Sequence, residues 1–93
     1  MKYYKNVFSA LATKGGIEVY LYIYHMCKTE QYPSFEDIRV DTGLKVDTLR
    51  RLTNRLSRYG LIYSSQIPSG GRQRVFKVTN SAVAKLIESL CMI

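Results

Sequence analysis

Apolar residues in the first third of the chain fall at the spacing of α-helices. Over residues 3–13 they recur every three or four positions, which is typical of a short amphipathic helix. From residue 17 to residue 27 nearly every side chain is apolar, and a helix of this kind is either central to its domain or shared with another subunit. Gly15 and Gly16 separate the two predicted helices.

The middle of the chain predicts two short helices joined by a tight turn. Ser34 suits the N-cap of a helix over 35–42, and Asp37 stands at the third helical position, from which an acid can close a capping box. Gly43 then supplies the left-handed residue with which many helices end. A further helix is predicted over 46–59, because its apolar residues again follow the helical period.

After residue 60 the apolar pattern changes to a period of two, which is typical of β-strands. Residues 61–67 alternate, a Pro-Ser-Gly-Gly turn follows, and residues 74–79 predict the returning strand. A last helix with one apolar stripe is predicted over 82–91. We therefore predict a single domain over residues 1–93, mainly α with a small β hairpin at 61–79.

The net charge of +7 is confined to one third of the chain. Eight basic side chains and one acid lie between residues 45 and 77, whereas acids and bases cancel elsewhere. A segregated charge creates a one-sided field that steers a polyanion to one face. Nucleic acid and an anionic membrane surface are both polyanions. No apolar run reaches the roughly 18 residues of a spanning helix and no signal peptide is evident, so we expect no membrane partner and a cytoplasmic protein.

The 46–59 helix carries most of this charge on one side. At roughly 100° per residue, its core stripe consists of Leu49, Leu52, Thr53 and Leu56. The opposite side, its flanks and the residue before the helix collect Lys45, Asp47, Arg50, Arg51, Asn54, Arg55 and Arg58. Arginine can bind guanine and asparagine can bind adenine through their major-groove edges, so this side is suited to reading DNA.

A basic face laced by salt bridges is the structural alternative for this helix, but Asp47 is its only acid. Asp47 itself has two interpretations. The helix dipole favours an acid near the start of a helix, which is the simpler, structural explanation. A carboxylate that accepts a hydrogen bond from the cytosine amino group is the alternative.

Four short motifs lie in and just after the predicted helix pair. They are Thr42-Gly43-Leu44 in the turn, Thr48-Leu49 in the next helix, Tyr59-Gly60-Leu61-Ile62 at its end, and Gly70-Gly71-Arg72 in the hairpin. With them, residues 17–90 resemble the winged helix-turn-helix family of transcription regulators, in particular the small MarR-like and ArsR-like members of prokaryotes and of archaeal viruses and plasmids. The resemblance implies a homodimer that binds double-stranded DNA, with residues 34–59 as the helix-turn-helix and 61–79 as the wing.

In that family the tip of the wing lies along the DNA backbone or enters the minor groove, where narrow A·T stretches attract arginine. The resemblance thus assigns Arg72, Gln73 and Arg74 to DNA contacts. A plain solvated hairpin is the alternative for this segment.

The first two predicted helices, over 3–13 and 17–27, and the last one predict a dimer interface. They hold more apolar side chains than one small core can cover, namely Tyr4, Phe8, Leu11, Tyr22, Leu86 and Leu90. The terminal helices pair the subunits in the resembling regulators, so 3–13 and 82–91 are expected to dimerise. Cys27 and Cys91 are too few for a secreted disulfide framework; they are small core or interface residues, or they form one bridge within or between chains.

Nothing in the sequence favours an enzyme. His25 is spaced as His-x-Cys with Cys27, but no third or fourth metal ligand lies nearby, and neither a Gly-rich phosphate loop after a strand nor a paired-carboxylate site is present. We expect no cofactor, no metal and no small-molecule effector. Three alternatives to a transcriptional regulator stay open: a replication or plasmid maintenance protein with the same fold, a winged helix that binds protein, and a sensor for which only the cysteines hint at redox control.

Overall fold

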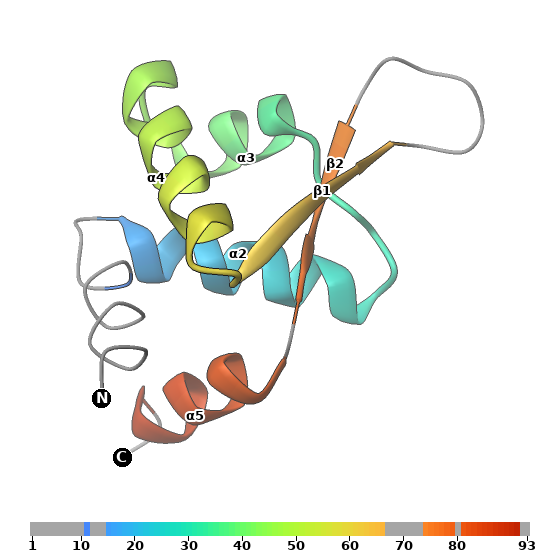
Figure 1. Ribbon diagram of the computed structural model, residues 1–93, viewed down its shortest axis with the longest axis vertical. Coiled ribbons are helices and arrows are strands. Elements are labelled where there is room, and N and C mark those ends of the chain that lie inside the picture. Colours follow the sequence, from blue (N-terminus) through green and yellow to red (C-terminus); the bar gives the residue numbers. More distant parts are fainter. Residues whose placement is uncertain (1–10, 12–14, 67–73, 80, 92–93) are drawn as a thin grey trace.

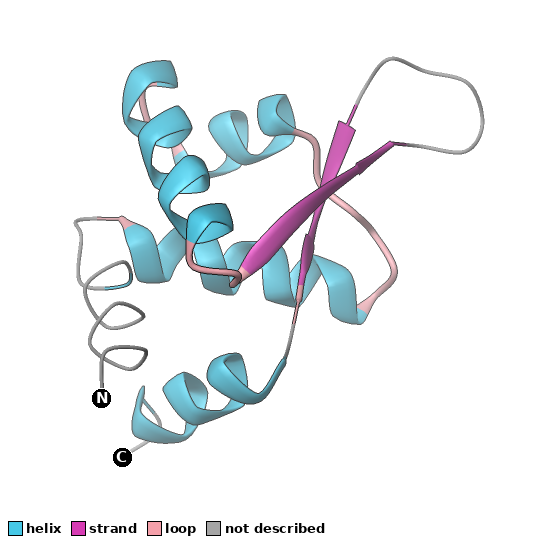
Figure 2. Cartoon of the chain, in the orientation of Figure 1, coloured by secondary structure: helices cyan, strands magenta, loops and turns pink. Residues whose placement is uncertain are grey.

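The computed structural model describes residue 11 and residues 15–66, 74–79 and 81–91, and their elements follow the predicted order (Figures 1 and 2). These elements are α2 (Gly16–Lys28), α3 (Phe35–Thr42), α4 (Val46–Arg58), β1 (Ile62–Gln66), β2 (Arg74–Val78) and α5 (Ser81–Cys91). Each bound lies within one residue of the predicted one. Of the predicted 3–13 helix, only Leu11 is among the described residues.

Helix α2 lies at the centre of the fold, which is one of the two arrangements that its nearly apolar sequence predicts. It contacts α3, α4, α5 and β2, and in Figure 1 α3 and α4 lie on one side of it and α5 on the other. Val19, Tyr20 and Ile23 are fully buried. The helix begins after Gly15, which has a left-handed φ of 87°, a conformation that suits glycine. A Cβ added at this position would lie only 3.1 Å from a side-chain carbon of Leu52, which also favours glycine.

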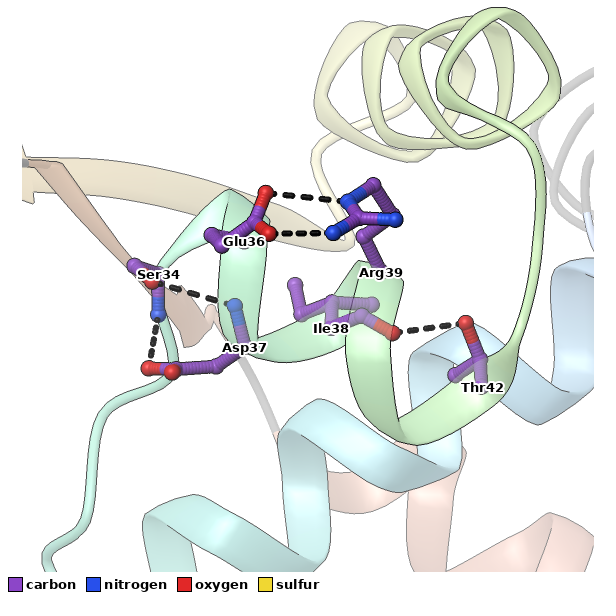
Figure 3. Close-up of polar contacts among 6 residues, drawn as sticks. All are labelled: Ser34, Glu36, Asp37, Ile38, Arg39 and Thr42. Atoms are coloured by element: carbon purple, nitrogen blue, oxygen red, sulfur yellow. Dashed lines mark hydrogen bonds and ion pairs between the residues drawn. The ribbon is translucent and has the colours of Figure 1, made fainter.

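Helix α3 begins with the predicted capping box (Figure 3). The hydroxyl of Ser34 accepts a hydrogen bond from the Asp37 N–H at 3.2 Å, and the Asp37 carboxylate accepts one from the Ser34 N–H at 3.0 Å. Two N–H groups at the helix start, which have no partner within the helix, are thereby satisfied. Ile38 is the fully buried residue through which α3 packs on the core.

The turn between α3 and α4 also forms as predicted. Gly43 is left-handed, with a φ of 71°, and its N–H donates to the carbonyl of Arg39 at 3.0 Å. The Thr42 hydroxyl donates to the carbonyl of Ile38 at 2.6 Å (Figure 3). It also accepts a hydrogen bond from the Leu44 N–H at 3.4 Å. The chain therefore leaves α3 sharply and starts α4 after three residues.

The hairpin is attached to the start of α3. Its strands are antiparallel and pair Ile62 with Val78 and Gln66 with Arg74. The Phe76 N–H donates to the carbonyl of Pro33 at 2.8 Å, which ties β2 to the segment just before α3. The tip of the predicted wing, residues 67–73, lies outside the described residues.

Helix α5 packs its Ala84 side against the core, with Val83 and Ile87 beside it. A polar contact joins it to α2, with 3.7 Å between Nε2 of His25 and Oε2 of Glu88. Within the described part of the chain, no helix is long and apolar enough to cross a membrane.

Candidate nucleic-acid interface

Helix α4 divides between core and solvent as its sequence predicts. Its inner stripe is buried and consists of Leu49, Leu52, Thr53 and Leu56. Its outer side is exposed and forms a shallow depression lined by Asp47, Arg50, Arg51, Asn54, Arg55, Arg58 and Tyr59. Every residue predicted on the reading side of this helix therefore lies on one surface. Lys45, the N-cap, is exposed and makes no side-chain capping bond.

Three of the four arginines of this surface have no acidic partner among the described residues. Arg50, Arg51 and Arg58 form no ion pair with any carboxylate in the described parts of the chain. Arg50 instead lies over the ring of Phe35, with 6.0 Å between its guanidinium carbon and the ring centroid. Four arginines on a helix with one acid therefore leave a strongly positive surface, which attracts polyanions.

A second groove separates α4 from the hairpin and the start of α3. It is lined by Ser34, Phe35, Glu36, Thr53, Asn54, Ser57, Ser64, Arg74 and Phe76. Arg74 is exposed, and its Nη1 donates to the Ser64 hydroxyl at 3.2 Å. Asn54 lines both the depression and this groove, so the outer side of α4 is continuous with the wing.

Sequence reasoning missed two of the three serines that line this groove, Ser57 and Ser64. Ser57 lies three residues after Asn54 and so on the same side of α4, a signal that the helical period contains. Ser64 is brought there by the hairpin register, which pairs it with Phe76. Of the predicted wing residues, only Arg74 is described; Arg72 and Gln73 lie outside the described residues.

The predicted interface residues fall into different environments. Leu11 is 4% exposed and belongs to the core of the chain itself. Leu86 and Leu90 are 55% and 62% exposed on α5. Tyr4 and Phe8 lie outside the described residues.

Tyr22, the remaining predicted interface residue, is half-buried, and its hydroxyl donates to the Asp41 carboxylate of α3. Partial burial, this hydrogen bond and the negative charges of Asp41 and Asp37 raise the pKa of Tyr22 well above its ordinary value. The side chain therefore links α2 to α3 within one chain.

Cys27 and His25 belong to no metal-binding cluster among the described residues. Cys27 is a free, half-buried thiol with a weak contact from Sγ to the Phe76 carbonyl at 4.0 Å. The side chain of Cys91 is outside the described part of the chain, so a bridge stays a prediction. The described residues contain no cluster of three or more His, Cys, Asp or Glu side chains that could hold a metal ion.

No family model matches the chain, and no curated protein matches it. Solved structures match over most of its length. The homodimeric winged helix-turn-helix DNA-binding domain of Mb0332 from Mycobacterium bovis, a possible ArsR-family transcriptional regulator, is 18% identical, with a TM-score of 0.77 over 98% of this chain and 77% of its own. AF1382 from Archaeoglobus fulgidus is 13% identical, with a TM-score of 0.73 over 90% of this chain and 91% of its own.

A mutant of MepR from Staphylococcus aureus, bound to an oligodeoxyribonucleotide, is 20% identical, with a TM-score of 0.68 over 98% of this chain and 67% of its own. At such identities the likenesses establish the fold alone. The chain has a winged helix-turn-helix fold, in which α3 and α4 form the helix pair and β1 and β2 form the wing, as the sequence predicted.

Proposed function

We propose that this winged helix-turn-helix protein binds double-stranded DNA sequence-specifically, as a homodimer that regulates transcription. The observation that carries the proposal is the outer surface of α4. It exposes arginines and an asparagine that suit base edges, and Arg50, Arg51 and Arg58 have no carboxylate partner among the described residues.

Helix α4 would lie in the major groove, whose width of about 12 Å admits one α-helix. Arg51 and Asn54 point to solvent near the middle of the helix, where they can reach guanine O6 and N7 and adenine N6 and N7. Arginines at the edges of the surface would bind phosphates, which fix the position of the protein without reading sequence.

The groove beside α4 suits the DNA backbone. Ser57 and Ser64 offer hydroxyl donors from its two walls, and Arg74 adds a charge. Hydroxyls and guanidinium groups are common phosphate ligands in protein–DNA interfaces. The role of Arg72 and Gln73 in the minor groove or along the backbone stays what the family resemblance implies.

The exposed apolar side chains of α5 support a dimer. Leu86 and Leu90 are four residues apart, on one side of a helix that already packs Ala84 into the core. A second copy is the occupant that best fits, because the Mb0332 domain with the same fold is homodimeric. Two-fold pairing would set the recognition helices about 34 Å apart, or a multiple of that, and so call for a palindromic site.

Titration of a fluorescent duplex at increasing KCl concentration tests DNA binding. The logarithm of the binding constant is expected to fall linearly with the logarithm of the salt concentration, and Arg74→Ala is expected to flatten that slope by about 0.9 if it removes one phosphate contact. A binding constant that does not change with salt concentration, or no binding to any duplex, would instead favour a winged helix that binds protein.

Sedimentation equilibrium at micromolar concentration tests the dimer. We expect twice the chain mass of 10.7 kDa, and Leu86→Glu together with Leu90→Glu is expected to yield the monomer. A wild-type species of 10.7 kDa that binds one unrepeated half-site would exclude it.

A further inference from the structure

The proposed function leaves one residue of the α4 surface unexplained. Asp47 is exposed and lines the same depression as Arg50, Arg51 and Asn54. An acid on a surface that meets DNA phosphates weakens binding to every sequence by like-charge repulsion. Its presence there calls for a compensating role, either within the protein or on the DNA.

Contacts within the protein do not supply that role. The Asp47 side chain has no hydrogen bond or ion pair with any described residue. Arg50 and Arg51 follow it by three and four residues, the spacing at which ion pairs form along a helix, yet neither pairs with it. The N-cap of α4 is Lys45, and the helix has no side-chain capping bond. Only the helix dipole remains, and at an exposed position salt screens its effect.

The acids of α3 differ in this respect. Asp37 closes the capping box with Ser34, and Glu36 accepts from the Arg39 guanidinium at 2.9 Å. Each acid in the first turn of α3 therefore has a partner inside the chain, whereas the acid in the first turn of α4 keeps its lone pairs free.

We propose that Asp47 is a specificity residue, whose carboxylate accepts a hydrogen bond from the N4 amino group of cytosine in the major groove. The inference rests on the proposed function, because it needs α4 in that groove. An ionised carboxylate only accepts hydrogen bonds. Cytosine presents only a donor there, guanine presents two acceptors, and adenine places its N7 acceptor beside its amino donor, so the carboxylate favours cytosine.

The position of Asp47 along α4 agrees with this role. Residues in the N-terminal part of a recognition helix are those that reach base edges in helix-turn-helix proteins. Asp47 is the second residue of α4, and Arg51 lies one turn further on the same side. An acceptor and a bidentate donor in this order are suited to a cytosine and a guanine within the same short stretch of sequence.

Selection of binding sites from a random duplex library tests the proposal with wild type, Asp47→Ala and Asp47→Asn. The wild-type site is expected to contain a cytosine, for which Asp47→Ala loses about tenfold discrimination while the other positions keep theirs. Asp47→Asn is expected to shift that position toward adenine, because an asparagine amide binds adenine N6 and N7. Both variants lose the same charge, so electrostatics alone cannot make them prefer different bases.

Glu18→Gln is the matched control. Glu18 is an exposed acid in the first turn of α2 and lines neither the depression nor the groove. This variant is expected to keep the wild-type preference at every position. If the Asp47 variants also select the wild-type site and merely bind all sequences more tightly, Asp47 is a helix-dipole residue and the inference is wrong. A wild-type protein that selects no sequence would overturn the proposed function, and this inference with it.

Discussion

The polar side chains of α3 have partners within the chain, whereas several of those on α4 have none among the described residues. Helix α3 satisfies its charged and polar side chains within the chain: its capping box is closed, Glu36 pairs with Arg39, and Asp41 accepts from Tyr22 of α2. Its polar groups therefore fix its start and its place on the core.

Helix α4 has no side-chain cap, and several of its charges are left without partners. In the described parts of the chain, Lys45 makes no capping bond and Asp47 has no hydrogen bond or ion pair. Arg50, Arg51 and Arg58 have no carboxylate partner there. Its place in the fold depends instead on its buried leucine stripe. A helix held mainly from its apolar side keeps most of its polar side available for a ligand, and this contrast is the physical basis of the proposed function.

The largest expected effect is on DNA affinity. Arg51→Ala and Asn54→Ala are each expected to cost about 1–3 kcal/mol on the preferred site and to relax the preference at one base pair. Lys28→Ala is the control, because it removes one positive charge from the last turn of α2, where the exposed side chain lines neither the depression nor the groove. Fluorescence anisotropy on preferred and random duplexes gives both affinities. Equal losses for the Lys28 and Arg51 variants would mean that net charge, and not the α4 surface, binds DNA.

The next largest effect is on stability, at the starts of the two helices. Ser34→Ala opens the capping box and is expected to lower the free energy of unfolding by about 1 kcal/mol. Lys45→Ala, at the N-cap of α4, removes no capping bond and is expected to leave that free energy nearly unchanged while weakening DNA binding. Urea unfolding followed by circular dichroism measures both. If the Lys45 variant is as destabilised as the Ser34 variant, α4 also depends on its N-cap residue, and the difference drawn between the two helices is wrong.

The smallest effect concerns the link between α2 and α3 at high pH. Below its ordinary pKa of 10.0, Tyr22 is protonated in folded and unfolded chains alike, so its hydrogen bond to Asp41 contributes fully. Above that pH the unfolded chain ionises first, because folding raises the pKa of Tyr22, and stability is expected to fall as the pH rises. The unfolding free energy of the Tyr22→Phe variant should fall less than that of the wild type between about pH 9 and pH 11, where tyrosine begins to ionise. Identical declines in unfolding free energy would show that Tyr22 is not responsible.

The elements of this fold were predictable because local signals mark both of their ends. Ser34 and Gly43 bound α3 through a capping box and a left-handed residue, and the structure has both. The buried and exposed sides of α4 were predictable from the helical period of its apolar residues alone. Leu49, Leu52 and Leu56 can be buried together only if the arginines face outward.

Contacts between elements were not predictable from these signals. The groove that joins Ser57 to Ser64 depends on how the hairpin packs beside α4, which no local pattern encodes. Leu11 was predicted at an interface, but it packs in the core of its own chain, because an apolar stripe does not say which neighbour covers it. The hydrogen bond from Tyr22 to Asp41 joins residues nineteen positions apart and depends on the same packing.

Methylation interference on a selected duplex tests most directly whether the outer surface of α4 reads the major groove. Methylation of guanine N7 blocks the edge that arginine would bind. We expect particular methylated guanines to prevent binding of the wild-type protein, and the Arg51→Ala variant to become insensitive to methylation at one of them. Wild-type binding that no methylated guanine disturbs, or the same set of sensitive guanines in the variant, would contradict the account.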